Sequence, residues 1–305
     1  MGALKEEAVE VVSKMTSTAT GKVYGVQRVC RTWKLSRATY YNRTSEAKPG
    51  KKDCSSRFHC DSFLVKRIRH HIQVSPFHDE GYRKIWARLR YEGVRTSKER
   101  VRRLMKAHHL QSVKRPRRER GNKAHDGRIT TERPDQMWGM DATSTVTTRE
   151  GTAHIFIAVD HHSQECLGIH ASKSGQTIQA LEPLRQAMRH SFDDYNDSVG
   201  IGVTIRHDHG SQYISKLFQS ELRFLGIESS PSYVREPQCN GVAERFIKTL
   251  KEQLSHVTYF DTIEDLRCPL LEFKDEYNRS WLCQKDHDKT PSQVREDYFQ
   301  AQRVA

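Results

Sequence analysis

The chain has 305 residues, of which 51 are Lys or Arg and 38 are Asp or Glu, and its net charge at pH 7 is +13. No apolar run approaches the roughly 20 residues that a membrane-spanning helix needs. The N-terminus lacks the apolar stretch of a secretory signal. These features exclude a membrane-spanning protein and favour a cytoplasmic one of two or three structural units.

Charge is distributed unevenly along the chain. Residues 1–134 hold 33 Lys and Arg against 13 Asp and Glu, whereas residues 135–305 hold 18 against 25. This asymmetry is typical of a polyanion-binding region joined to a region that keeps its own carboxylates. We therefore expect nucleic acid as the partner, and a basic surface that serves solubility alone is the alternative.

Residues 1–44 are predicted to form a helical segment that resembles a helix-turn-helix. Ser36 can cap a second helix beginning at Arg37, which places Arg37 where recognition helices usually meet DNA. Residues 45–60 collect Pro, Gly, Ser and Lys without periodicity, so we predict a linker there.

Residues 61–112 are predicted to form a three-helix domain that binds DNA. Apolar residues recur at helical spacing in three runs, which Pro76 and Gly93 interrupt. The third run begins after Ser97, a suitable N-cap, and a solvated basic face is the alternative interpretation of its cations. The predicted DNA contacts on this helix are Lys98, Arg100, Arg102 and Arg103.

Residues 113–134 are predicted to be a basic linker. Six of the eleven residues from 113 to 123 are Lys or Arg, and such a run cannot pack as a core. It is expected to neutralise phosphates in an extended form. The residues proposed for this role are Lys114, Arg115, Arg117 and Arg118.

Strand-like and helix-like runs alternate after residue 135. Three β-like runs, at 136–146, 153–160 and 165–172, precede a helix and a fourth strand at 199–208. A helix, a short fifth strand and another helix follow, so the order is βββαβαβα. This order predicts an α/β catalytic core over residues 135–255, with a five-stranded mixed sheet and flanking helices. Residues 256–305 are predicted to be a C-terminal helical region.

Three acids stand in or at the ends of these elements. Asp141 lies in the first strand, Asp208 closes the fourth, and Glu244 begins the last helix, with 35 residues between Asp208 and Glu244. Convergent carboxylates are hard oxygen ligands suited to Mg²⁺ or Mn²⁺. Two such ions can activate an attacking oxygen and stabilise the leaving oxygen of a phosphodiester. We therefore predict phosphodiester chemistry at these acids.

The sequence around these acids resembles the second-frame catalytic product of bacterial insertion sequences of the IS-three family, whose core is similar to retroviral integrases. The resemblance rests on the motifs MWGMDAT, RHDHGSQY and QCNGVAERFIKTLKEQL, one around each acid. It extends to GYRKIWARLRYEGV, SKERVRRLMKAH and VCRTWKLSRATYY upstream, and so spans nearly the whole chain. The D-D-E set in its N-G-x-x-E-R-F context is the most specific part.

The resemblance implies an RNase H-like core and a DDE transposase that cuts and joins DNA strands at element ends in the bacterial cytoplasm, where it associates with the nucleoid. By similarity, Asp141, Asp208 and Glu244 are the catalytic residues and hold two Mg²⁺ ions, for which Mn²⁺ substitutes. The implied partners are element-end and target DNA, further copies of the chain in a dimer or larger oligomer, and a first-frame protein. The alternatives are a non-catalytic DNA-binding regulator of transposition and a nuclease without a joining step.

More DNA contacts are predicted beside Glu244. Lys248 lies one turn further on the same helix face and Lys251 nearly so, where both could steer phosphates. Solvated charges are the alternative for these lysines. Gln238 and Asn240, in the segment before the helix, are candidate contacts to the element end.

Two other groups could bind a metal. Asp160, His161 and His162 end a strand, but adjacent strand side chains point to opposite faces, so we predict a turn. Cys54 and Cys60 lack the paired spacing of a zinc site, and the chain has no C-x-x-C pair. We therefore expect no zinc.

Overall fold

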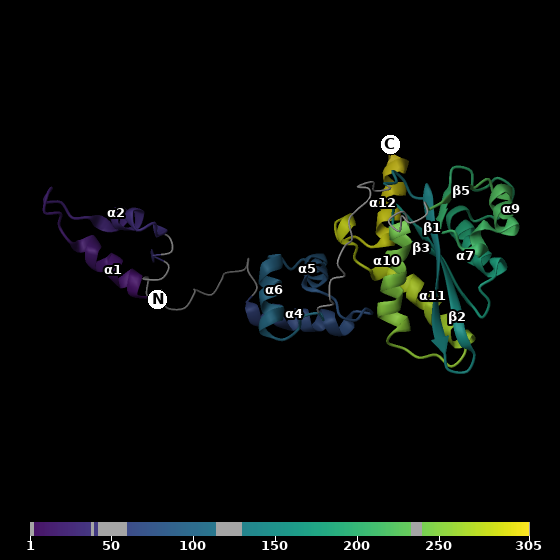
Figure 1. The fold of residues 1–305 in the computed structure, drawn as a ribbon, viewed down its shortest axis with the longest axis horizontal. Coiled ribbons are helices and arrows are strands. Elements are labelled where there is room, and N and C mark those ends of the chain that lie inside the picture. Colours follow the sequence, from purple (N-terminus) through teal and green to yellow (C-terminus); the bar gives the residue numbers. More distant parts are fainter. Residues whose placement is uncertain (1–2, 38–39, 42–59, 114–129, 233–239, 305) are drawn as a thin grey trace. The chain divides into compact units, whose positions relative to one another are not determined.

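The computed structural model describes residues 3–37, 40–41, 60–113, 130–232 and 240–304. They belong to two compact units, Met1–Cys60 and Asp61–Ala305. In the first unit, the helices α1 (Ala3–Lys14) and α2 (Gly25–Thr32) pack against each other (Figure 1). Its small core contains Val9, Val29, Cys30 and Tyr40.

The second unit begins with three helices, α4 (Asp61–Val74), α5 (Tyr82–Tyr91) and α6 (Lys98–Ala107). The hydroxyl of Ser97 accepts a hydrogen bond from the Arg100 N–H at 3.2 Å, so Ser97 caps α6 as its sequence predicts. The apolar residues at helical spacing are buried together, whereas Ile72, in the last turn of α4, is 37% exposed.

The segment after α4 packs on the C-terminal part of the chain. Phe77 meets Trp281 edge-on with ring centroids 4.9 Å apart, and the Lys84 Nζ lies 2.7 Å from the centre of the Trp281 ring. Burial lowers the pKa of Lys84 to about 7, against the opposing charge of Glu80. A lysine is therefore buried where the helical domain meets the rest of the unit.

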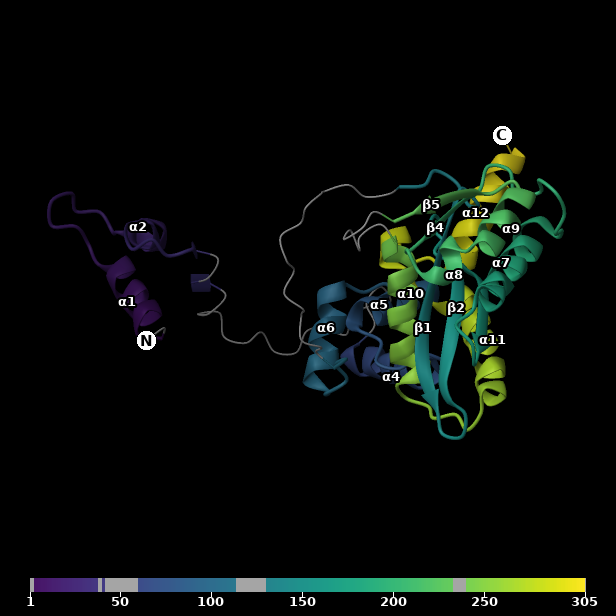
Figure 2. The same ribbon diagram turned by 45° about the vertical axis from the view of Figure 1, so that its right-hand side comes forward.

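The sheet has five strands in the order β3-β2-β1-β4-β5. The pairs β1–β2 and β2–β3 are antiparallel, whereas β1–β4 and β4–β5 are parallel, so the sheet is mixed. The long β1–β2 hairpin forms its centre (Figure 2). The strands are β1 (Met137–Thr147), β2 (Gly151–Asp160), β3 (Cys166–Ser172), β4 (Thr204–His207) and β5 (Glu228–Pro231).

Helices cover both faces of the sheet, which explains why β2 is a nearly continuous apolar run. Ile155 and Ile157 face a core shared with α10 and α11, whereas Phe156 and Ala158 face a core shared with α7 and α9. Trp138 of the first strand is fully buried in the second core. The helices are α7 (Thr177–Phe192), α8 (Ser211–Ile214), α9 (Lys216–Phe224), α10 (Gly241–Leu250) and α11 (Ile263–Ser280).

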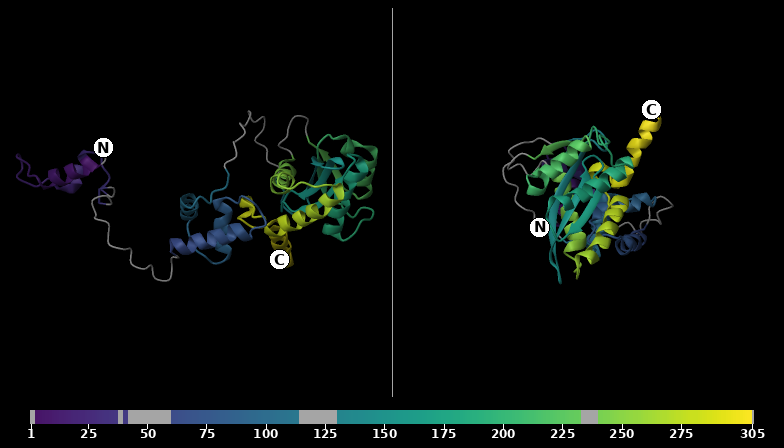
Figure 3. Two further views of the ribbon diagram at one scale, coloured as in Figure 1. Left: turned by 90° about the horizontal axis from the view of Figure 1, so that it is seen from below. Right: turned by 90° about the vertical axis from the view of Figure 1, so that its right-hand side faces the viewer.

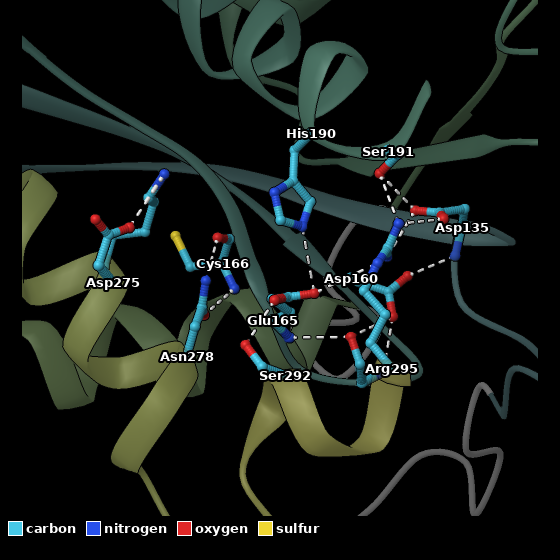
Figure 4. A network of polar contacts seen from close by, with 12 residues as sticks. Asp135, Asp160, Glu165, Cys166, His190, Ser191, Asp275, Asn278, Ser292 and Arg295 are labelled. Atoms are coloured by element: carbon cyan, nitrogen blue, oxygen red, sulfur yellow. Dashed lines mark hydrogen bonds and ion pairs between the residues drawn. The ribbon is translucent and has the colours of Figure 1, made fainter. Parts of the chain in front are cut away.

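A π-helical turn, Lys251–Ser255, extends α10, and the chain ends in α12 (Pro291–Val304), seen in yellow in Figure 3. Arg295 of α12 holds this helix on the sheet through a bidentate ion pair with Asp135, at 2.6 and 3.1 Å (Figure 4). No helix in the described ranges is long and apolar enough to cross a membrane.

Candidate active site

Asp141, Asp208 and Glu244 come from three elements that meet on the sheet. Asp141 lies in β1, and Asp208 directly follows β4, the parallel neighbour of β1. The register pairs Gly139 with Arg206, so two further residues along each strand lead to Asp141 and Asp208. Glu244 lies in the first turn of α10, which packs against β1 and β2. Three acids far apart in sequence thus lie near the end of the β1–β4 pairing, beside the start of α10.

The environment of Asp141 concentrates negative charge. Burial is the largest cause of the rise of its pKa to about 6, and the charges of Asp208 and Glu244 contribute to the same rise. A hydrogen bond from the Ala142 N–H to Oδ1, at 2.7 Å, and the charge of Lys251 act in the opposite direction. The net effect disfavours the carboxylate form, so this site stabilises a positive charge placed beside it.

The other two acids are only weakly neutralised by the protein. Asp208 accepts a hydrogen bond from the Gly210 N–H at 2.9 Å. Burial raises the pKa of Glu244, whose carboxylate makes no hydrogen bond or ion pair within the described part of the chain. The buried Tyr213 hydroxyl lies near enough to Asp141 and Asp208 for both charges to raise its pKa, in addition to burial.

A groove of about 670 Å³ opens at Asp141 and Glu244. Asp208 is not among the residues that line it. Within the described ranges, no three His, Cys, Asp or Glu side chains are arranged to hold a metal ion together. The groove is lined by Asp141, Ala142, Glu244, Ile247, Lys248, Lys251, Glu252, His256 and Val257.

The two lysines predicted beside Glu244 both line this groove. The Lys248 Nζ lies 3.9 Å from a carboxylate oxygen of Glu252, and its side chain is 72% exposed. Lys251 begins the π-helical turn and is near enough for its charge to lower the pKa of Asp141. Cations and carboxylates thus occupy the same groove, an arrangement suited to a phosphodiester.

The cations predicted on α6 interact mostly with neighbouring acids. Arg100 and Arg103 contact Asp61 at 2.6 and 3.6 Å, and Arg102 contacts Glu99 at 2.5 Å. These pairs are partly or largely exposed, so they are weak and DNA phosphates can compete for the arginines. The predicted α6 contacts therefore remain available for a polyanion.

The remaining predicted contacts have different surroundings. Arg37 is exposed, and the Lys98 Nζ lies 4.3 Å from the centre of the Trp86 ring. Asn240 is only 6% exposed and its amide points into the protein. Five residues lie outside the described ranges: Lys114, Arg115, Arg117, Arg118 and Gln238.

Asp160 is the last residue of β2, and His161 and His162 form the turn that follows, as predicted from the sequence. The Asp160 carboxylate accepts hydrogen bonds from the N–H and hydroxyl of Ser163 at 2.7 and 2.8 Å. His162 Nδ1 lies 3.0 Å from the Thr131 carbonyl oxygen, while the His161 ring is turned toward β1 and the start of α10. The alternation of side chains along a strand predicted that these adjacent side chains point in different directions. The packing of α10, which the sequence did not predict, places the His161 ring close to the candidate site.

Three known domain families match the chain. The HTH-like domain matches residues 61–118, and two families described as Integrase core domain match residues 131–237 and 225–282. The chain therefore contains an HTH-like domain followed by an integrase core. The predicted fold class, an RNase H-like mixed sheet preceded by a helical domain, is confirmed.

Two transposases of insertion sequences are similar to this chain over most of its length. The transposase for insertion sequence element IS629 of Shigella sonnei is 26% identical over 287 residues, which cover 90% of this chain and 93% of the relative. The transposase InsD for insertion element IS2A/D/F/H/I/K of Escherichia coli is 29% identical over 237 residues, covering 75% and 76%. The chain is homologous to insertion-sequence transposases, which confirms the resemblance seen in its sequence.

Retroviral integrases are among the solved structures that resemble the chain. The catalytic core domain of BIV integrase is 18% identical, with a TM-score of 0.40, and covers 56% of this chain and 97% of its own. A simian T-cell lymphotropic virus intasome structure is 18% identical, with a TM-score of 0.42, and covers 75% and 74%.

Proposed function

We propose that this chain is a DDE transposase that binds the ends of its insertion sequence and catalyses Mg²⁺-dependent DNA strand cleavage and strand transfer. The observation that carries the proposal is the groove in which Asp141 and Glu244 face Lys248 and Lys251, with Asp208 acting on Asp141 from the neighbouring strand. The homology to transposases supports this assignment.

The donor chemistry of the three acids suits divalent cations, although their side chains are not drawn together around one point in the described structure. Their donors are carboxylate oxygens, which Mg²⁺ and Mn²⁺ prefer, and burial with mutual repulsion raises the pKa of Asp141 to about 6. Asp141, Asp208 and Glu244 would hold two Mg²⁺ ions, for which Mn²⁺ substitutes. When bound, the ions would supply activation of the attacking oxygen and stabilisation of the leaving oxygen.

Two groups of basic residues bind and orient the DNA in this proposal. Lys248 and Lys251 position the phosphate backbone in the groove, because their charges line it beside the carboxylates. The basic N-terminal part of the chain, residues 1–134, binds the element ends through phosphate contacts. Joining two ends requires more than one catalytic site, so the active species is a homo-oligomer on DNA, with or without a first-frame protein.

The test uses labelled element-end DNA incubated with the full chain in Mg²⁺, Mn²⁺, Ca²⁺ or EDTA, with cut and joined strands resolved on a denaturing gel. Cleaved and joined products are expected only with Mg²⁺ or Mn²⁺. Binding without any product would instead favour a non-catalytic regulator, and nicks without joined strands would favour a nuclease.

Glu244→Gln is the variant that assigns the site. It removes one carboxylate oxygen ligand while keeping shape, so products should disappear while the gel shift with DNA in Ca²⁺ persists. Glu264→Gln is the matched control, because the Glu264 side chain is 78% exposed on α11 and lies outside the groove. Cleavage retained by Glu244→Gln would contradict the assignment.

A further inference from the structure

Two buried polar atoms face the same point on β1. A Cβ placed on Gly139 would lie 2.5 Å from Oδ1 of Asn240, 2.9 Å from Nε2 of His161 and 3.3 Å from the Cβ of Ala243. Gly139 therefore allows the start of α10 and the His161 ring to approach the strand closely. Gly139 also points to the same face of β1 as Asp141, two residues later.

The Asn240 amide is oriented by the backbone of β1. The β1–β4 pairing ends at Gly139 and Arg206, and the next β1 carbonyl, that of Met140, accepts a hydrogen bond from Asn240 Nδ2 at 2.9 Å. Because a carbonyl can only accept, the nitrogen of the amide must face Met140. Oδ1 therefore faces the other way and is available as an acceptor for His161.

His161 supplies the matching donor. Its backbone N–H donates to the Met137 carbonyl at 2.9 Å, which fixes the residue beside β1. Burial lowers the pKa of its imidazole to about 4, so the ring is neutral, and the interaction with Asn240 opposes that fall. Neither Nε2 of His161 nor Oδ1 of Asn240 has a hydrogen-bond partner within the described ranges. A neutral ring protonated on Nε2 would let each of these two unpartnered atoms satisfy the other.

We propose that His161 and Asn240 form a positioning pair that holds the N-terminus of α10 on β1 and thereby fixes Glu244 relative to Asp141. Asn240 immediately precedes α10, which carries Glu244, and it bonds to Met140, the residue before Asp141. The inference rests on the proposed function, since the pair acts through the carboxylates that would hold the divalent cations. Neither side chain contacts the DNA or the cations in this role.

The pair makes a specific prediction about metal requirement. Groups that orient metal ligands typically change metal affinity or activity by about 10–100-fold when they are removed. His161→Leu and Asn240→Leu should each raise the Mg²⁺ concentration for half-maximal cleavage by about 10-fold or more, while DNA binding in Ca²⁺ is unchanged. The double variant should need no more Mg²⁺ for half-maximal cleavage than the more impaired of the two single variants, because each single change already breaks the pair.

Rescue separates positioning from general stability. His161→Gln retains an N–H donor near the position of Nε2 and should restore the Mg²⁺ requirement to within about 3-fold of the wild type. The matched control is His162→Leu, because His162 contacts Thr131 and the Tyr298 ring instead of α10, and its Mg²⁺ requirement should not change. Gly139→Ala, whose Cβ would meet both polar atoms, should reproduce the defect of His161→Leu.

The experiment is a Mg²⁺ titration of element-end cleavage by the full chain, with the Mn²⁺-induced rise in melting temperature of the DNA-free protein as a second readout. An unchanged Mg²⁺ requirement and Mn²⁺ response in His161→Leu would overturn the pair and leave the proposed function standing. Failure of His161→Gln to rescue would also overturn it. A wild type with neither metal-dependent cleavage nor a Mn²⁺ response would contradict the proposed function, and the pair with it.

Discussion

Two groups of three acids flank the same sheet, one buried and one open to solvent, and the protein neutralises them very differently. Asp135, Asp160 and Glu165 are all buried, and Arg295 lies between the first and the last of them, at 2.6 Å from Asp135 and 3.6 Å from Glu165. The hydroxyls of Ser163, Ser191 and Ser292 donate to the same three carboxylates at 2.8 to 2.9 Å (Figure 4).

The second group, Asp141, Asp208 and Glu244, has no comparable partner. Two backbone N–H groups donate to Asp141 and Asp208, and no arginine or hydroxyl within the described chain bonds to the three acids. Asp208 and Glu244 are exposed and Asp141 is half-buried, so water reaches this group, whereas the buried charges of the first group must be paired within the protein. The internally paired acids therefore hold this fold together, whereas the solvent-facing acids are left without protein cations that neutralise them, as the proposed divalent-cation site requires.

The largest expected effect comes from exchanging one acid of each group for its amide. Asp141→Asn should lower cleavage by about 10³-fold or more, because it removes an oxygen ligand, without lowering the free energy of unfolding. Asp160→Asn should instead lower the free energy of unfolding by about 1–3 kcal/mol, because an amide nitrogen would face bound N–H and O–H donors. Urea unfolding and the cleavage assay measure both, and the reverse pattern would break the comparison.

The second prediction concerns the cation of the paired group. Arg295→Met should lower the free energy of unfolding by about 3–5 kcal/mol, because it leaves Asp135 and Glu165 buried without their positive partner. Arg303→Met, on the exposed side of the same helix, should change it by no more than about 0.5 kcal/mol. Equal effects of the two substitutions in urea unfolding would contradict a structural role for the group.

The third prediction tests which group responds to added metal. Mn²⁺ at about 100 times its dissociation constant should stabilise the wild type by about 2.7 kcal/mol, because it binds only the folded site. Asp141→Asn should abolish this stabilisation, whereas Arg303→Met should keep it in full. Thermal unfolding with and without Mn²⁺ measures the difference, and a full response in Asp141→Asn would place the metal elsewhere.

The smallest effect concerns Lys84, a buried cation outside both groups. Its folded-state pKa of about 7 lies below the ordinary value of 10.5, so between these pH values the unfolded chain binds the proton that the folded chain lacks. Stability relative to Lys84→Met should therefore rise by about 1–2 kcal/mol from pH 7 to pH 8.5. Parallel urea titrations of both proteins check this, and a fall over the same range would show that Lys84 stays charged in the folded protein.

Local patterns predicted the elements well where one face of an element is buried. Ser97 caps α6, and the order of strands and helices matches the mixed sheet. Ile72 continues an apolar stripe yet is 37% exposed, because the contacts that bury α4 end one turn earlier, at Ile68. Apolar periodicity predicts which face of a helix is buried, but it does not predict how far along that face the packed helices extend.

The order of elements, the division of charge and the three acids in their motifs could all be predicted from the sequence, because they depend on residues close together in the chain. The tertiary structure decided which acids are paired, since Asp135 meets Arg295 from 160 positions away. It also decided that Asn240 points inward and that His161 lies beside α10, because both follow from the close approach of that helix to Gly139. Contacts of this kind form only when distant segments pack, so no local pattern encodes them.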